Sequence, residues 1–182
     1  MKENLFEDLK KILGPKDVLS TFEERYCYSY DATNTCFMPD AVVIPHSSEQ
    51  VVELMKYASA NKIPVVSRGA GSGYTGGSLP VKGGMVVSFE QMNKILEVNR
   101  DKMYAVVEAG VVTQDFFDEM LKLGLFYPPD PSSIKTSTLG GNVAECAGGL
   151  RGRKYGVTKN YVIGLEFILY NGDINRTGVL DS

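Results

Sequence analysis

Residues 67–78 read SRGAGSGYTGGS and place five glycines within the nine positions from Gly69 to Gly77. Each glycine costs roughly 0.5–1 kcal/mol of extra chain entropy on folding. A stretch this rich in glycine therefore needs a compensating role. Backbone that wraps closely around an anion provides one, because bare N–H groups bind phosphate oxygens. We call residues 67–78 the glycine loop, and it predicts a nucleotide-type cofactor site.

Composition narrows the class of protein. The 182 residues are 43% hydrophobic and 23% charged, which fits a packed domain or two small lobes sharing a cleft. A net charge of -3 argues against a nucleic-acid surface. No apolar run approaches the ~20 residues of a membrane span. Cys27, Cys36 and Cys146 show no metal-ligand spacing, so we expect reduced thiols, no metal site and a cytoplasmic location.

The first half of the chain alternates strands and helices. Apolar spacing predicts a helix from Leu5 to Leu13, ended by Gly14-Pro15. A strand at 41–44 precedes a helix for which Ser47 and Gln50 fit a capping box, and a second strand follows at 64–67. Strand, helix and strand in this order predict a right-handed parallel βαβ unit.

Further elements follow the glycine loop. We expect strands at 85–89, 95–98 and 104–108, a helix capped by Thr113, a short helix at 138–145, and strands at 161–170 and 174–177 joined at Asn171-Gly172. Tyr26, Tyr28 and Tyr30 alternate as in an edge strand. The predicted division is an N-terminal helix and wrapping segment at 1–40, one lobe at 41–110 and a second at 111–182, with the seam near Gly110.

Two familiar phosphate motifs do not fit the glycine loop. Gly71 to Gly76 satisfies G-x-G-x-x-G, but a dinucleotide fingerprint must open a helix, and here the chain runs into another strand. A Walker loop is excluded because no Gly-Lys-Ser/Thr follows. The glycine pattern alone is therefore a weak signal, and a cluster of structural turns explains it nearly as well.

A second glycine and hydroxyl segment strengthens the case for a cofactor. Residues 128–142 read PPDPSSIKTSTLGGN and lead into the short helix, which Ser137 or Thr138 can cap. A helix N-terminus favours anions by ~0.3–1 kcal/mol. Glycine pairs at 140–141 and 148–149 allow close approach of the backbone. We expect a long ligand between the two lobes, such as an adenosine diphosphate half with a ring system attached.

Four motifs in fixed order carry a family resemblance. They are PHSSEQV at 45–51, PVVSRGAGSGYTGG at 64–77, PDPSSIKTSTLGGNVAECAGG at 129–149 and KYGVTKNYVIGLE at 154–166. The chain resembles the FAD-binding domain of the vanillyl-alcohol oxidase (PCMH-type) family, and within it the glycolate oxidase flavoprotein subunit and D-lactate dehydrogenases. The resemblance implies an α+β, two-lobed fold with a small parallel βαβ lobe and a mainly antiparallel sheet with helices.

The same resemblance implies which residues contact FAD. The pyrophosphate would lie against the glycine loop, the ribityl chain and flavin ring beside the second segment, and the adenine end near the last glycines. The implied cofactor-binding residues are Ser67, Arg68, Gly69, Ala70, Gly71, Ser72, Gly73, Ser78, Pro131, Ser132, Ser137, Thr138, Gly141, Asn142, Gly148, Gly149, Gly156 and Ile163. Relatives with covalent flavin carry a histidine in the glycine loop, whereas position 72 is Ser, so we expect non-covalent FAD.

The activity implied is oxidation of a small D-2-hydroxy acid, glycolate or D-lactate, by hydride transfer to flavin N5. Electrons would pass on to a separate acceptor protein or a quinone. In the family a substrate domain follows, so we expect a truncated, inactive chain that holds FAD weakly and carries no catalytic residue. The alternatives are an enzyme of the alkyldihydroxyacetone phosphate synthase or enolpyruvyl-glucosamine reductase type, and a non-enzymatic nucleotide-binding module.

Single polar residues admit plainer interpretations. His46 stands between Pro45 and Ser47, where a solvated or capping role fits better than catalysis. Arg68 can pair with a phosphate or with a carboxylate. Cys146 has no basic neighbour and reads as a small buried hydrophobe. The basic residues at 151–154 read as a solvated turn.

Overall fold

The computed structural model describes residues 4–178, which form two compact units. Unit 1 combines the chain up to Gln91 with the segment from Ile163 onward, and unit 2 is 92–162. The predicted seam near Gly110 therefore falls inside unit 2. The last two strands belong to unit 1, and the first of them, β7 (Gly164–Ile168), contacts helix α3 (Ser48–Asn61) of that unit. Residues 1–3 and 179–182, the ends of the predicted ranges 1–40 and 111–182, lie outside the described residues.

Unit 1 is built on a four-stranded sheet. Its spatial order is β1 (Val18–Leu19), β2 (Ala41–Val43), β4 (Met85–Ser88) and β3 (Val65–Arg68). Strand β4 is parallel to both β2 and β3, and helix α3 (Ser48–Asn61) links β2 to β3. The predicted parallel βαβ unit is confirmed, with β4 inserted between its two strands.

Helix α3 begins as its sequence indicates, with one shift. The Ser47 hydroxyl accepts from the Gln50 amide at 3.4 Å, which satisfies one of the free N–H groups of the first turn. The Gln50 side chain accepts from the His46 amide at 2.7 Å, so the reciprocal half of the capping box lies one residue earlier than expected. The helix ends at Lys62, which adopts a left-handed conformation with φ 54°.

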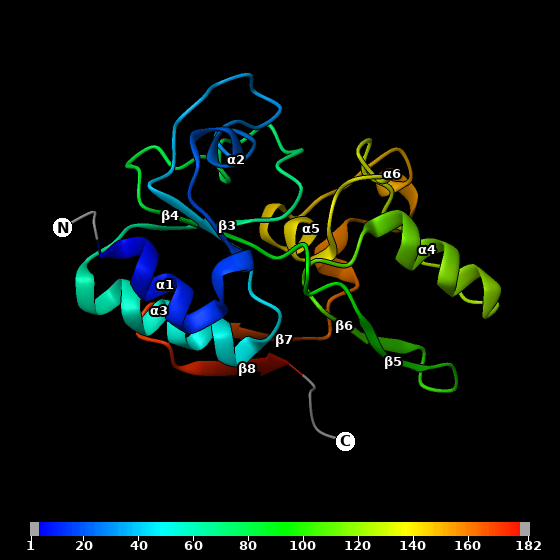
Figure 1. The fold of residues 1–182 in the computed structure, drawn as a ribbon. Helices are drawn as coiled ribbons and strands as arrows, with labels where there is room; N and C mark the ends of the chain where they lie inside the picture. The colour runs from blue at the N-terminus through cyan, green and yellow to red at the C-terminus, as the bar shows by residue number, and fades with distance from the viewer. Residues whose placement is uncertain (1–3, 179–182) are drawn as a thin grey trace. The chain divides into compact units, whose positions relative to one another are not determined.

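One face of this sheet carries the core of unit 1. Helices α1 (Leu5–Leu13) and α3 lie side by side over it (Figure 1). Leu9, Leu54 and Met85 are fully buried there. Each such side chain contributes roughly 1.5–3 kcal/mol on burial, so this layer holds the helices on the sheet.

The opposite face of the sheet carries a buried arginine. Strand side chains alternate between faces, so Arg68 and Val66 lie opposite Val65 and Ser67, and Arg68 is in register with Ser88. Arg68 is only 6% exposed and Ser88 is completely buried. A charged side chain this deeply buried requires partners, and they come from the segment before β2.

That N-terminal segment holds a 3₁₀ turn (η1, Pro15–Asp17) and a short helix α2 (Phe22–Tyr26). The predicted edge strand through the tyrosines is therefore wrong. Thr21 and Glu24 form a capping box, with the Glu24 carboxylate accepting from the Thr21 amide at 2.9 Å, which starts a helix there. The Phe22 and Tyr26 rings stack with centroids 5.9 Å apart.

Unit 2 packs helices on an antiparallel pair of strands. The pair is β5 (Ile95–Asn99) and β6 (Tyr104–Val107), and the other elements are α4 (Thr113–Lys122), α5 (Leu139–Glu145), α6 (Gly152–Tyr155) and a second 3₁₀ turn, η2 (Thr158–Asn160). Val111, Phe116, Met120 and Leu139 form its core.

The chain returns to unit 1 as the antiparallel hairpin of β7 (Gly164–Ile168) and β8 (Ile174–Gly178). The turn expected at Asn171-Gly172 is confirmed, and Gly172 has the positive φ (86°) that such a turn requires. Among the described residues, no helix is both long and apolar enough to cross a bilayer.

Gly84 provides a test of how β4 docks beside β3. Its φ is 81°, and a Cβ there would lie 2.2 Å from the Pro64 carbonyl oxygen. Gly84→Ala should lower the free energy of unfolding by at least about 1–3 kcal/mol, because the backbone must strain or shift. Chemical denaturation measures this. Gly73→Ala is the control, since its Cβ would meet nothing within 4 Å, and equal stability of the two variants would contradict the docking.

Candidate functional site

The glycine loop begins at the carboxyl end of β3. Residues 69–84 carry the chain from β3 to its neighbour β4, a parallel connection that normally contains a helix. Here the connection consists of turns and contains no helix. The structure thus agrees with the rejection of the dinucleotide fingerprint, which would have required a helix after Gly76.

Several amides of the glycine loop remain available. Within residues 4–178, the N–H groups of Gly69, Ala70, Gly71 and Gly73 donate to no protein acceptor, whereas Gly77 N–H donates to the Thr75 hydroxyl at 3.3 Å. All four positions are exposed or partly exposed. Nest-type sites bind phosphate oxygens through main-chain N–H groups that have no internal acceptor.

Two glycines of the loop have different reasons to be glycine. Gly71 has φ 66°, and a Cβ there would lie 2.2 Å from Nη2 of Arg68. Gly71 is therefore fixed by an internal contact with the guanidinium. Gly73 has no positive φ, and its Cβ would meet nothing within 4 Å. No contact among the described residues accounts for glycine at 73, and contact of this position with a ligand stays a prediction.

The Arg68 side chain is occupied by internal partners. Nη2 donates to the Tyr30 carbonyl at 2.8 Å and Nη1 to the Ser78 hydroxyl at 3.4 Å. Burial lowers the pKa of Arg68, and the negative charge of Asp31 opposes that shift. These contacts are to a carbonyl and a hydroxyl, so both roles left open by the sequence, pairing with a phosphate or with a carboxylate, stay predictions. Arg68, at the start of the glycine loop, is bonded to Ser78, its last residue.

Tyr28 lies against this arginine. The Arg68 guanidinium lies 5.8 Å from the Tyr28 ring centroid, and the phenol donates to both Glu90 oxygens at 3.1 Å. Burial, followed by the charge and hydrogen bond of Glu90, raises the pKa of Tyr28 to about 12. The sequence pattern placed Tyr28 in an edge strand and did not select Asp31 or Glu90. The tyrosine-rich composition of this segment was the available signal.

The other predicted residues of the loop lie on its outside or at its end. Ser67 and Ala70 are exposed, Ser72 is partly exposed, and Ser78 accepts the hydrogen bond from Arg68. These positions are compatible with a bound diphosphate along residues 67–73. The direct contacts of each side chain with a cofactor stay predictions.

The second segment is anchored in unit 2 by a buried polar network. The Thr113 hydroxyl donates to the Ser137 carbonyl at 2.9 Å and accepts from the side-chain Nδ2 of Asn142 at 2.7 Å. It also lies 2.9 Å from the Ser137 hydroxyl. Thr113 is fully buried, and Asn142 is 2% exposed. The expectation that Thr113 caps helix α4 is wrong: the N-cap is Val112, and the Thr113 hydroxyl is used for this network.

Thr138 is the N-cap of α5, as the sequence allowed. Its hydroxyl accepts from the Gly141 amide at 3.3 Å. Gly140 lies against Ala109, where a Cβ would be 2.8 Å from the Ala109 carbonyl oxygen. Part of the predicted anion-binding helix start is thus satisfied by its own cap. The side chains of Ser137, Thr138 and Asn142 position the segment through internal hydrogen bonds.

The glycines after α5 pack against the Pro-Asp-Pro stretch and a nearby turn. A Cβ at Gly149 would lie 2.1 Å from the Asp130 carbonyl oxygen, and one at Gly156 would lie 2.6 Å from Oδ1 of Asn160. A Cβ at Gly148 would meet only the Val157 side chain, at 3.2 Å. Pro131 is partly exposed and Ser132 is exposed. Ile163 belongs to unit 1 and is 56% exposed.

Arg151 is not the solvated residue that its basic cluster suggested. Its amide donates to Oδ1 of Asp130 at 3.0 Å, and its Nε lies 3.4 Å from Oδ2 of the same carboxylate. The guanidinium lies 5.2 Å from the Phe117 ring and 5.3 Å from the Phe126 ring. Cys146, expected to be buried, is half-buried and ends α5 in a left-handed conformation.

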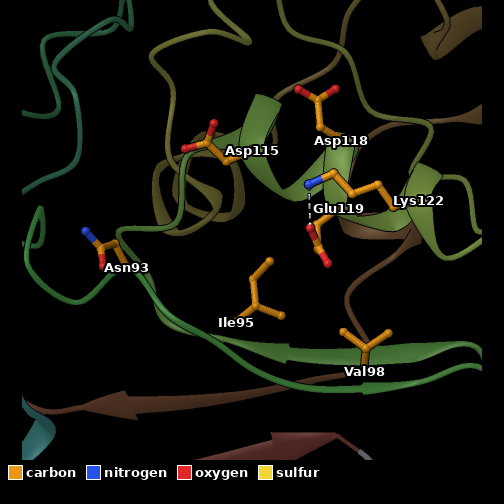
Figure 2. Close-up of a pocket in the computed structure, with 7 residues that line it drawn as sticks. All are labelled: Asn93, Ile95, Val98, Asp115, Asp118, Glu119 and Lys122. Atoms are coloured by element: carbon orange, nitrogen blue, oxygen red, sulfur yellow. Dashed lines mark hydrogen bonds and ion pairs between the residues drawn. The ribbon is translucent and has the colours of Figure 1, made fainter.

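An open groove in unit 2 lies elsewhere. It has a volume of about 670 Å³ and runs between α4 and β5, with Ile95 and Val98 on the strand side (Figure 2). The helix side carries Asp115, Asp118 and Glu119, and Lys122 pairs with Glu119 at 3.0 Å. An excess of carboxylates repels a diphosphate. None of the predicted cofactor residues lines this groove.

Comparison with known proteins identifies what this arrangement resembles. Residues 39–178 match the family described as "FAD binding domain". The chain is 47% identical over 173 residues to glycolate oxidase subunit GlcD of Bacillus subtilis (strain 168), covering 94% of this chain and 37% of the relative. It is 38% identical over 176 residues to a D-lactate dehydrogenase of Anaerostipes hadrus, covering 96% and 37%. The chain thus spans little more than a third of these relatives.

Solved structures agree. A crystal structure of p-cresol methylhydroxylase with substrate bound matches with a TM-score of 0.85 and 26% identity, covering 97% of this chain and 35% of that one. An alkyldihydroxyacetonephosphate synthase matches with a TM-score of 0.81 and 26% identity, covering 90% and 36%. The predicted α+β, PCMH-type fold is confirmed.

Tyr28 gives a pH-dependent test of the arginine network. Because its pKa is raised from 10.0 to about 12, the folded chain holds this proton more tightly than the unfolded chain. The associated stability is complete below pH 10 and is lost as pH rises toward 12. The free energy of unfolding of the wild type should therefore fall more steeply over this range than that of Tyr28→Phe. Parallel curves from urea titrations would show that the phenol is not held in this way.

Proposed function

Because the chain belongs to the family of FAD binding domains, we propose that it forms the FAD-holding part of a flavoprotein oxidoreductase that oxidises a small D-2-hydroxy acid, glycolate or D-lactate. The observation that supports the cofactor site is that, within residues 4–178, the N–H groups of Gly69, Ala70, Gly71 and Gly73 have no protein acceptor, and that no internal contact explains the glycine at 73. The hydroxy-acid substrate rests on the 47% identity to a glycolate oxidase subunit.

In this proposal the glycine loop binds the diphosphate. Amides at Gly69, Ala70, Gly71 and Gly73 donate to its oxygens, and the Arg68 charge beneath Gly71 favours an anion above it. In unit 2, Pro131, Ser132 and Gly141 flank the ribityl chain and flavin, while the Thr113 network holds that segment in place. The adenine end lies near Gly148, Gly149, Gly156 and Ile163. When bound, FAD supplies a ring that accepts a hydride from the α-carbon of the hydroxy acid.

The chain contributes binding and orientation, and we assign no acid–base step to its side chains. Ser72 stands where covalent relatives carry histidine, so the cofactor is held without a covalent bond. Substrate recognition and electron transfer to an acceptor protein or quinone belong to the remainder of the full-length protein. Cysteine usage typical of a reducing compartment supports a cytoplasmic location.

Turnover by the full-length protein that carries this sequence tests the substrate. D-lactate or glycolate should reduce the bound flavin, seen as loss of its visible absorbance. An alkyldihydroxyacetonephosphate synthase has a similar fold. Activity only on the substrate of such a synthase, or only on an enolpyruvyl-glucosamine, would therefore replace the proposal. FAD that binds without reduction by any of these would favour a non-enzymatic module. Colour that stays in an acid-precipitated pellet would contradict non-covalent binding.

Gly71→Val should abolish FAD binding by the full-length protein. The substitution forces a side chain into the Arg68 guanidinium, with Cβ 2.2 Å from Nη2, at a backbone with φ 66°. The expected result is loss of flavin absorbance from the purified protein with the far-ultraviolet dichroism retained. Gly152→Val is the control, since a Cβ there makes an ordinary 3.7 Å contact. Normal flavin occupancy in Gly71→Val would rule out the glycine loop as the diphosphate site.

A further inference from the structure

We propose that Tyr28–Asp31, a segment preceding the matched family domain at 39–178, is a positioning element of the cofactor site. It holds the Arg68 guanidinium beneath Gly71 and thereby fixes the glycine loop in the form that binds a diphosphate. This inference rests on the proposed function. It adds to that function a part of the chain that neither the family match nor the motifs include.

The glycine loop needs a support of this kind. The N–H groups of Gly69, Ala70, Gly71 and Gly73 donate to no protein acceptor within residues 4–178, so main-chain bonding at these four positions does not hold the loop. Glycine also has the widest choice of backbone angles. A contact that does hold the loop is the close packing of Gly71 on the guanidinium, with Ser78 bonded to Nη1 at the far end.

The guanidinium is in turn held from the N-terminal segment. Nη2 donates to the Tyr30 carbonyl at 2.8 Å, and the Tyr28 ring lies below the charge at 5.8 Å. Tyr28 is fixed by the hydrogen bonds of its phenol to Glu90, which also accepts from the Ser88 hydroxyl at 3.2 Å. The Arg68 side chain is thus held by residues 28–31, by the glycine loop and, through Tyr28 and Glu90, by Ser88 of β4.

Asp31 supplies the counter-charge. It is 5% exposed, and its Oδ1 accepts from the Thr33 amide at 2.9 Å and the Thr33 hydroxyl at 2.6 Å. Its charge favours the protonated form of Arg68, against the effect of burial. A buried cation is expensive without such compensation, so the charge of Asp31 favours burial of Arg68 under the loop.

Asp31→Asn distinguishes a positioning role from a long-range charge effect, because the two predict opposite changes in the Kd for FAD. Removing a negative charge near an anion site should tighten FAD binding if only the long-range field matters. If Asp31 positions Arg68, binding should weaken, with at least a roughly tenfold rise in Kd, corresponding to about 1.4 kcal/mol. The measurement is titration of FAD, and separately of ADP, into the apo form of the full-length protein. ADP tests the diphosphate loop without the flavin.

Asp101→Asn in an exposed turn of unit 2 is the matched control and should bind as the wild type does. Tyr28→Phe provides a second variant, because it removes the bond to Glu90 and leaves the charge unchanged. It too should raise Kd for FAD and for ADP, and circular dichroism confirms that each variant is folded at the titration temperature. If Asp31→Asn does not fold, Tyr28→Phe decides.

The outcomes separate the two proposals. Wild-type protein that binds no FAD overturns the proposed function and this inference with it. Wild-type protein that binds FAD, together with Asp31→Asn and Tyr28→Phe variants that bind as tightly or more tightly, overturns the positioning role alone. Weaker binding of both ligands by folded variants supports it.

Discussion

The packing of Gly71 on the buried Arg68 guanidinium is the contact on which the candidate site depends. Strands β3 and β4 are parallel neighbours, so the chain must travel back along the sheet between them. A helix in that connection would pair its own amides. The turns found instead leave the amides of Gly69, Ala70, Gly71 and Gly73 without acceptors in the part of the chain that the structure describes. A helix would normally fix the path of such a connection. Here the contact of Gly71 with the Arg68 side chain fixes it.

This arrangement has opposing energetic terms. Five glycines cost roughly 0.5–1 kcal/mol each in chain entropy, and a buried cation adds a desolvation penalty. The hydrogen bonds to the Tyr30 carbonyl and the Ser78 hydroxyl, with the Asp31 charge, offset the second term. Neither the glycines nor the buried arginine improves packing of the core, which lies on the other face of the sheet with Leu9 and Leu54. In the proposed function, the compensating gain comes from the diphosphate that the amides of Gly69, Ala70, Gly71 and Gly73 bind.

Local signals predicted α1, α3, α4, α5 and the strands β2 to β8 from the sequence, whereas α2, α6 and β1 were not predicted. The Ser47 cap, the turn at Asn171-Gly172 and the loop after β3 each follow from residues close together in the chain. Contacts between distant residues could not be predicted. Arg68 bonds to a carbonyl 38 positions earlier, and Thr113 to a residue 29 positions later. A single sequence carries no signal for such pairs.

The misplaced boundary comes from the same limit, whereas the wrong prediction for the tyrosine segment has a local cause. The division near Gly110 assumed that consecutive elements share a unit, but the hairpin β7–β8 packs on α3 of unit 1. Alternating tyrosines suggested a strand because periodicity ignores the cap at Thr21, which begins a helix one residue later. In both cases a local pattern was overruled by a contact that the pattern does not encode.

The glycines show how far structure refines a motif. Gly140 and Gly149 approach backbone so closely that a Cβ would lie 2.8 Å or less from a carbonyl oxygen, so the fold itself requires them. Gly71 is required by the arginine beneath it. A count of glycines treats all of these as ligand contacts. Of Gly71, Gly73, Gly140 and Gly149, only Gly73, with an ordinary φ and open space where a side chain would stand, has no such internal reason. The case for close approach of a ligand is therefore strongest at that one position, next to the unpaired amides.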